Sequence, residues 1–300
     1  MKNKILLCMV VILFVIYLSK GSVKENTSFL DYKLVVKDLS TNKTFDINME
    51  DYLIGVVAGE MPASYEKEAL KAQAVASRSY ALYKSKNRKR DYDLTTDNKT
   101  QVYLTNDQLK KKWGSKYDEY LKKVTDVIND TKGEIITYDN QVISAYYFSM
   151  SNGMTENSKD VFNEDKPYLV SVKSLENNAI KNYSRELSFS IKSFCSKLSI
   201  KDCSKINISN INYNDTHHVK DIRINNKLYT GLDLRKLLGL YSTDFNITIN
   251  KDNVIITCIG HGHDVGMSQT GANLMAKKGF TYKEILNHYY TGIEISKINV

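Results

Sequence analysis

The chain has 300 residues, of which 42% are hydrophobic and 25% charged, an ordinary globular composition that excludes wholesale disorder. Lys and Arg (42) outnumber Asp and Glu (34), so the formal charge of +8 suggests an anionic partner without saying which one. Two prolines and four cysteines exclude long Pro-rich linkers and a disulfide framework, although Cys195, Cys203 and Cys258 could form one pair in some redox state. At about 150 residues per domain, the length predicts two domains, or one with a large insertion.

The first twenty residues are expected to form a membrane anchor. An unbroken apolar run of fourteen residues, 5–18, lies between lysines. A full span usually needs about 20 residues, so this length alone favours a signal peptide, but flanking lysines can snorkel and lengthen the span. We expect an uncleaved single-pass anchor at 1–20, with a cleaved signal as the alternative, followed by a polar tether at 21–30. In both cases the rest of the chain lies outside the cytoplasm, where the usual polyanion is cell wall rather than nucleic acid.

Helix and strand patterns alternate through residues 31–167, the first part of the predicted core. The helix at 65–85 is rich in alanine, so another backbone can approach it closely, and a loose capping box at Ser64 opens it. The expected elements are strands at 32–36 and 44–47, helices at 49–59 and 65–85, a polar loop at 91–104, a helix at 115–129, and a hairpin of strands 134–138 and 141–148 with its turn at Asp139 and Asn140.

The amino-acid composition changes after Pro167. Residues 168–258 are rich in Asn, Lys, Ser and Ile, with short strands and one expected helix at 232–238, and they are typical of a separate lobe. Residues 259–300 are glycine-rich and then helical, at 267–278 and 282–289, and complete the core. The predicted fold class is α+β: mixed helices and small antiparallel sheets form the core, and a second, smaller lobe is inserted before the C-terminal helices.

Glu60 is the first candidate for a catalytic residue. It follows four small apolar residues, 56–59, and precedes Met61 and Pro62. Because proline disfavours helix in the residue before it, Glu60 should lie at a helix end, on a sharp turn, in apolar company. Desolvation there raises the pKa of a carboxyl group, and an acid that is protonated near neutral pH can donate a proton to a leaving oxygen. The alternative is an exposed glutamate at a helix end.

A glycine-rich segment at residues 261–272 is the second candidate. Its glycines allow unusual backbone angles and close approach to a ligand. His261 and His263 could share one face of a strand, as in a metal site, but no third ligand lies at a recognisable spacing, and His288 and Asp264 are only candidates. A polar loop that leads into a helix and lines a cleft is the preferred interpretation.

A third segment, residues 147–155, runs from aromatic strand residues into hydroxyl residues and glycine. Aromatic faces next to hydroxyl donors suit sugar binding. A strand end followed by a turn explains the same pattern.

Together, these three segments resemble the stage II sporulation protein D family of membrane-anchored lytic transglycosylases from endospore-forming bacteria. The resemblance covers most of residues 30–297. The matching pieces are residues 57–63 (VAGEMPA), 68–80 (EALKAQAVASRSY), 101–103 (QVY), 148–155 and 262–272.

The resemblance implies an α+β core with a groove for glycan and Glu60 as the catalytic acid/base, with no cofactor. It implies that the substrate is peptidoglycan glycan stripped of its stem peptides, and that the partners are stage II sporulation proteins P and M, in septal wall remodelling during engulfment. The soluble part would face the septal space from the mother-cell membrane. On the matching motifs, the expected substrate-binding residues are Arg78, Gln101, Tyr103, Ser149, Ser151, Thr155, His263, Ser268 and Gln269.

The chain departs from the family pattern in two places, and the first is a possible zinc site. Some members carry a zinc site of one His and two Cys before Gln-Val-Tyr, where this chain has Arg88, Leu94 and Thr100, so we predict no zinc there.

The family usually has an aromatic residue at His261 and a glycine at Asp264. We therefore expect His263, which matches the family, to face the Glu60 cleft, and His261 to contribute less. The alternative is that His263 is a core histidine that fastens the loop.

Two rival functions belong to other classes. The first is a non-catalytic wall-binding protein that enhances a partner amidase, as related proteins are described. The second is a basic DNA- or RNA-binding protein, but the chain lacks a helix-turn-helix or an aromatic-basic signature, and its export segment argues against it.

Overall fold

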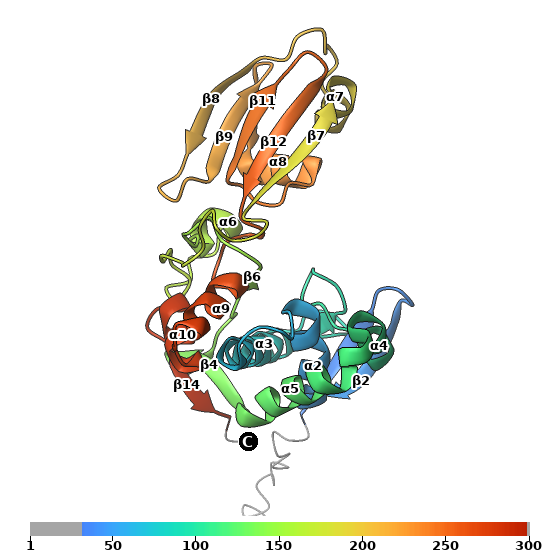
Figure 1. The fold of residues 1–300 in the computed structure, drawn as a ribbon, viewed down its shortest axis with the longest axis vertical. Coiled ribbons are helices and arrows are strands. Elements are labelled where there is room, and N and C mark those ends of the chain that lie inside the picture. The colour runs from blue at the N-terminus through green and yellow to red at the C-terminus, as the bar shows by residue number, and fades with distance from the viewer. Residues whose placement is uncertain (1–31, 299–300) are drawn as a thin grey trace, which may run out of the picture.

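The computed structural model describes residues 32–298 and shows an α+β protein in two parts, one above the other in Figure 1. The predicted anchor (1–20) and tether (21–30) lie outside the described residues. Within residues 32–298, no helix combines the length and the apolar character needed to cross a bilayer. We call the lower part, which contains Glu60, the core, and the upper part, residues 184–259, the second lobe.

The core begins with a small sheet and a buried helix. Strand β1 (Lys33–Asp38) pairs antiparallel with β2 (Lys43–Asn48) and parallel with the short β3 (Leu94–Thr95). Helix α2 (Met49–Glu60) follows β2 without a break, and most of its apolar side chains are buried. The two strands and the helix predicted for this region are confirmed.

Helix α3 (Lys67–Lys86) runs through the middle of the core (Figure 1). Its five alanines are fully buried, as the predicted close approach of other backbones requires. The predicted capping box is wrong: Glu66 is the N-cap, without a side-chain cap bond. Tyr65 donates its backbone N–H to the carbonyl oxygen of Pro62 in a turn (2.9 Å), which leaves Ser64 outside the helix.

Two helices cover one side of α2. Helix α4 (Asn106–Trp113) is joined by a single 3₁₀ turn (Gly114–Lys116) to α5 (Tyr117–Asp130), which confirms the helix predicted at 115–129. Helix α4 was not predicted, because Leu109 is its only buried residue and, apart from Trp113 at its end, the others are polar.

The predicted hairpin is shorter than expected. Strand β4 (Glu134–Tyr138) pairs with β5 (Gln141–Val142) through a turn in which Asp139 and Asn140 both have positive φ, and β14 (Glu294–Lys297) pairs with the other edge of β4. The predicted continuation of the second strand to residue 148 is wrong.

Those later residues pair with a distant segment instead. Strand β6 (Tyr147–Phe148) lies parallel to β13 (Met267–Ser268), immediately before helix α9 (Gln269–Lys277). Helices α9 and α10 (Tyr282–Tyr289) both pack against α3, and both confirm the helices predicted there, although α9 begins two residues later than expected. The β6–β13 pair brings two of the three sequence motifs side by side.

The second lobe contains two three-stranded antiparallel sheets around its own hydrophobic cluster. The sequence predicted one helix here and missed α7, whose Cys195 forms a disulfide with Cys203, while Cys258 is free and buried. The lobe consists of β7 (Ser184–Ser190), α7 (Ile191–Leu198), β8 (Ile208–Tyr213), β9 (Val219–Ile224), β10 (Lys227–Thr230), α8 (Gly231–Leu238), β11 (Phe245–Ile249) and β12 (Asn253–Ile259).

The residues of the two hydrophobic clusters can be compared with the domain boundaries expected at residues 167 and 258. Tyr168 and Leu169 pack in the cluster of the core, and the cluster of the second lobe extends from Phe194 to Cys258. The short helix α6 (Ser158–Phe162) and the chain after it lie between the two parts in Figure 1. The division at 31–167, 168–258 and 259–300 stays a prediction.

Candidate active site

Glu60 is the last residue of α2, and the chain turns sharply after it. Met61 adopts an extended conformation (φ −124°, ψ 141°), as a residue before proline prefers. A Cβ atom at Gly59 would lie 2.4 Å from the carbonyl oxygen of Val102, so only glycine lets this loop come so close. As a result, the Val102 N–H donates a 2.6 Å hydrogen bond to Oε1 of Glu60.

The surroundings of Glu60 favour a protonated carboxyl group. Burial raises its pKa to about 7, although hydrogen bonds from Val102, Gln269 and Tyr147 and the positive charge of Lys112 act in the opposite direction. Lys112 is close because α4 packs beside the end of α2, where its Nζ donates to the carbonyl oxygen of Ala58 (2.8 Å). Near neutral pH, Glu60 can therefore act as both acid and base.

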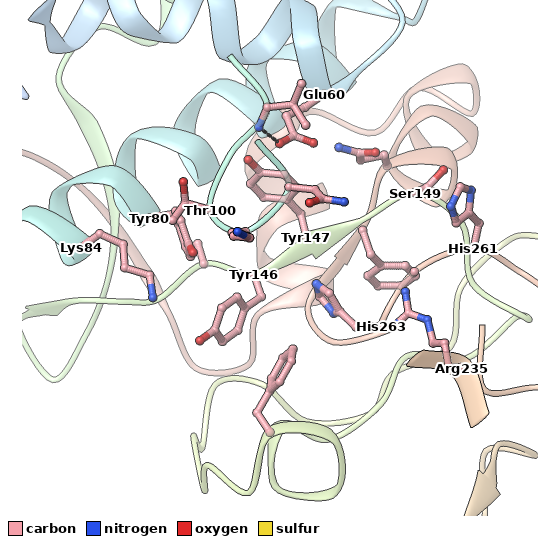
Figure 2. Close-up of a pocket in the computed structure, with 18 residues that line it drawn as sticks. Glu60, Tyr80, Lys84, Thr100, Tyr146, Tyr147, Ser149, Arg235, His261 and His263 are labelled. Carbon is pink, nitrogen blue, oxygen red and sulfur yellow. Dashed lines mark hydrogen bonds between the residues drawn. The ribbon is translucent and has the colours of Figure 1, made fainter. Parts of the chain in front are cut away.

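A cavity of about 620 Å³ opens beside Glu60 (Figure 2). This volume is typical of small-molecule sites, which measure about 300–1,000 Å³. Its walls combine aromatic rings, polar groups and cations, and among its described lining residues Glu60 is the sole acid. The aromatic rings and cations of the lining are Tyr80, Tyr146, Tyr147, Phe148, Phe162, Lys84, Lys99 and Arg235.

A second, smaller cavity of about 290 Å³ is also lined by Glu60. The two cavities share Glu60, Ser149 and Gln269, and the smaller one continues to Tyr65 and Lys112. Glu60 therefore lines both cavities.

Three of the predicted substrate-binding residues line the larger cavity: Ser149, His263 and Gln269. Ser149 directly follows β6, and Gln269 begins α9. The β6–β13 pairing holds these two segments together, and the Ser149 carbonyl accepts the N–H of Thr270 (3.0 Å). Gln269 is the first residue of α9 and bonds Glu60 and Gln73.

His263 lines the cavity and is also fastened within the loop. Its ring lies among those of Tyr146, Phe148 and Phe162, with centroids 5.1–6.1 Å apart, and its Nδ1 accepts the N–H of Val265 (3.1 Å). Burial lowers its pKa to about 4, so the ring is neutral near pH 7. His261 lines the same cavity.

Arg78, Gln101 and Tyr103 do not line either cavity beside Glu60. Arg78 is fully buried and forms a bidentate ion pair with Glu50 (2.7 and 2.9 Å). Gln101 is also fully buried and donates to the hydroxyl of Tyr147 (3.0 Å), so it acts on the cavity through that ring. The Tyr103 ring stacks on Tyr52.

Ser151, Thr155 and Ser268 are likewise buried and outside the cavity lining. The Ser151 N–H and the Ser268 hydroxyl both donate to the carboxylate of Glu176, and Ser268 also caps α9. Thr155 exchanges hydrogen bonds with the backbone of Val172. These residues shape the loops around the site, because their polar groups already have partners within the protein.

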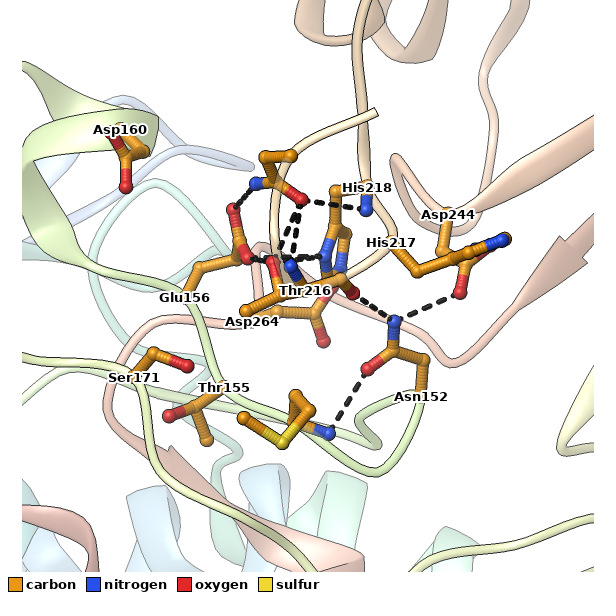
Figure 3. A network of polar contacts seen from close by, with 12 residues as sticks. Asn152, Thr155, Glu156, Asp160, Ser171, Thr216, His217, His218, Asp244 and Asp264 are labelled. Carbon is orange, nitrogen blue, oxygen red and sulfur yellow. Dashed lines mark hydrogen bonds and ion pairs between the residues drawn. The ribbon is translucent and has the colours of Figure 1, made fainter. Parts of the chain in front are cut away.

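The glycine-rich loop continues into a polar junction with the second lobe (Figure 3). Asp264 has a positive φ of 60°, a conformation that suits glycine. Its carboxylate accepts a hydrogen bond from Nε2 of His218 (3.0 Å), whose Nδ1 lies 3.1 Å from the carboxylate of Glu156. All three side chains are buried. We call this set the junction clamp.

The positions that correspond to zinc ligands in some family members have partners within the protein. Arg88 lies 3.7 Å from the carboxylate of Asp93, Leu94 is buried in β3, and Thr100 bonds the backbone of Thr95. Across residues 32–298, no group of three or more His, Cys, Asp and Glu side chains is arranged to hold a metal ion.

Several lining residues were missed by the sequence reasoning. Tyr147 lay within a motif but was not assigned a role. Lys112 belongs to the helix that was not predicted, and Arg235 belongs to the second lobe, far from every motif. Tertiary packing brings Lys112 and Tyr147 to Glu60 and Arg235 to the wall of the same cavity.

Comparison with known proteins agrees with the motifs. A family model described as "Stage II sporulation protein" matches residues 37–138, which include Glu60. The chain is 42% identical over 258 residues to stage II sporulation protein D of Bacillus subtilis (84% of this chain, 75% of that protein) and 41% identical over 264 residues to that of Bacillus amyloliquefaciens (86% and 77%). The amidase enhancer of Bacillus subtilis is 29% identical over 303 residues, with 81% of this chain and 40% of that protein covered. The chain therefore belongs to the stage II sporulation protein D family.

Proposed function

We propose that this protein is a peptidoglycan lytic transglycosylase that cleaves peptide-stripped glycan between MurNAc and GlcNAc. The observation that carries the proposal is Glu60: one acid, with a pKa raised to about 7, that lines two cavities whose described lining contains no other acid. Most glycosidases need a second carboxylate, as nucleophile or as the base that activates water. A transglycosylase needs only one, because the nucleophile is part of the sugar.

In this mechanism, protonated Glu60 donates its proton to the glycosidic oxygen as the bond from that oxygen to C1 of MurNAc breaks. The resulting carboxylate then takes the proton of the MurNAc 6-hydroxyl as its oxygen closes onto C1. Glu60 ends protonated, the product is a 1,6-anhydro sugar, and no water is consumed. The Val102 N–H, bonded to Oε1, holds the carboxyl group in place through both proton transfers.

The proposal includes the cellular setting that the family resemblance implies. An anchor at residues 1–20 would hold the site outside the cytoplasm, in the mother-cell membrane facing the septal space. The partners would be stage II sporulation proteins P and M, and the process would be septal wall remodelling during engulfment.

The test is digestion of glycan strands whose stem peptides have been removed by an amidase, followed by mass analysis of the new sugar ends. We expect 1,6-anhydro-MurNAc ends, lighter by one water than the reducing ends of a hydrolase. Reducing ends would identify a hydrolase and contradict the mechanism.

The second candidate is a non-catalytic enhancer of a partner amidase, favoured by the 29% identity to a protein named amidase enhancer. It predicts that the purified protein releases no anhydro sugars but accelerates an amidase on intact wall. The same digestion therefore distinguishes the two functions, because only the transglycosylase releases anhydro sugars.

A further inference from the structure

Arg235, on α8 of the second lobe, reaches the cavity that contains Glu60 (Figure 2). In the figure, Glu60 lies at the top of the set of lining residues, and Arg235 lies away from it at the lower right, near His261 and His263. The second lobe therefore contributes a cation to a site whose acid comes from the core.

The Arg235 guanidinium has no hydrogen bond and no ion pair with any residue of 32–298, although its side chain is partly buried. The acid that acts on it most strongly is Asp264, but the Asp264 carboxylate is bound to His218 (3.0 Å). A half-buried guanidinium whose donors have no partner among these residues is free to pair with an anionic ligand, in a setting that is less screened than open solvent.

A second arginine adds to the positive charge at this end of the cavity. The Arg185 guanidinium lies over the Tyr241 ring, 4.8 Å from its centroid, and its buried Nε has no hydrogen-bond partner. The Tyr241 ring in turn contacts His261 edge-on. Burial and the positive charges of Arg185 and Arg235 lower the pKa of His261, so its ring is neutral near pH 7. The positive charge at this end of the cavity therefore comes from the two arginines.

The placement of α8 relative to the cavity is fixed from the core. Gly231, the first residue of α8, packs so tightly against Val219 that a Cβ there would lie 2.0 Å from the Val219 carbonyl oxygen. Val219 directly follows His218, which the junction clamp ties to Glu156 and Asp264 of the core. The clamp therefore holds the start of α8, and with it Arg235, at the cavity.

We propose that Arg235 binds the lactyl carboxylate of a MurNAc residue whose stem peptide has been removed, and that the second lobe thereby selects stripped glycan. This inference rests on the proposed function. A guanidinium binds a carboxylate through two parallel hydrogen bonds, and stripping produces that carboxylate. In intact wall the same carboxyl group is an amide with the first residue of the stem peptide, so it has no charge and only one acceptor oxygen.

The test measures binding in the Glu60→Gln background, so that the glycan is not cleaved. The probes are a stripped GlcNAc–MurNAc tetrasaccharide and a GlcNAc tetrasaccharide of equal length, which lacks the lactyl groups. We expect Arg235→Gln to weaken binding of the first about tenfold or more and to leave the second unchanged. Lys236→Gln, which removes an exposed cation from the next position of α8, should change neither.

Arg235→Lys keeps the charge without the bidentate geometry, so it should retain part of the preference for the stripped probe, with an unchanged melting temperature. Equal loss on both probes, equal loss from Lys236→Gln, or no loss from Arg235→Gln would overturn the proposal, as would failure of the background variant to bind the stripped probe. The measurement requires no catalysis. A protein that releases no anhydro ends but shows the Arg235-dependent preference would contradict the transglycosylase and keep this inference.

Discussion

Burial of Glu60, opposed by the positive charge of Lys112, sets the pH range in which the site can act as an acid. Burial raises the Glu60 pKa to about 7, and the acid form, which starts the reaction, is present below that pH. The rate should therefore fall as pH rises through about 7. The measurement is the pH dependence of kcat/KM on stripped glycan.

Lys112→Met removes a cation that lowers the pKa of Glu60. That pKa should rise, and the alkaline limb of the profile should move to higher pH. Lys111→Met, at the exposed neighbouring position, should leave the limb in place. If the alkaline limb lies at the same pH in Lys112→Met and in Lys111→Met, the group that titrates in the profile is not Glu60.

His263 gives a prediction about stability. Its Nδ1 accepts the Val265 N–H and its ring fills a space between three aromatic rings, so His263→Ala should lower the free energy of unfolding by about 1–3 kcal/mol. The measurement is thermal melting beside glycan binding. An unchanged melting temperature with weakened binding would favour the role in the cleft over the role in fastening the loop.

The elements with strong periodicity or a clear end signal were predictable from the sequence. Helices α5 and α10 each bury one apolar face, and α2 and α3 are apolar or alanine-rich segments that are buried on nearly all sides. The chain turns after Glu60 because Pro62 lies two residues later. Helix α4 was not predictable because its eight residues contain only two apolar side chains, Leu109 and Trp113, among polar residues, which is too few to define an apolar face.

The site itself was only partly predictable. Glu60, Ser149, His263 and Gln269 line the cavity and belong to sequence motifs. Other motif residues, such as Arg78 and Ser268, have their polar groups bound within the protein, and a motif does not distinguish them from residues that face a ligand. The pairing of β6 with β13 joins segments more than a hundred residues apart, which no local pattern encodes.

The loop between α3 and α4 supports a prediction about metal. Arg88, Leu94 and Thr100 stand where some family members have zinc ligands, and each has contacts within the protein. Treatment with a chelator should leave activity and melting temperature unchanged, and elemental analysis should find no stoichiometric zinc. Loss of activity on chelation would point to ligands elsewhere, with His261 and His263 as the first to examine.

At the scale of the molecule, the junction clamp couples the two parts to pH. Burial alone lowers the pKa of His218, but hydrogen bonds to Asp264 and Glu156 and their charges outweigh it and raise the pKa to about 10. A raised pKa means that the folded state binds the proton more tightly. The stabilisation is therefore fully present below about pH 6.5, the ordinary histidine value, and is lost as pH rises through about 10.

His218→Gln should thus lower the free energy of unfolding by about 3 kcal/mol at pH 6 and by clearly less at pH 10. Urea unfolding of the wild type and the variant at both pH values measures this difference. His217→Gln is the matched control, because the His217 side chain is 64% exposed and its pair with Asp244 contributes little. If His218→Gln lowers the free energy of unfolding equally at both pH values, the clamp joins the second lobe to the core without a charged His218.

The central claim is that Glu60 carries out the chemistry, and the most direct test is the rate of anhydro-MurNAc release by Glu60→Gln from stripped glycan. The glutamine keeps the shape of the side chain and its bond from Val102 but has no proton to donate, so the rate should fall at least about a hundredfold with an unchanged melting temperature. Glu66→Gln, at the exposed N-cap of α3, should retain the wild-type rate. Near-normal release by a folded Glu60→Gln variant would contradict the mechanism.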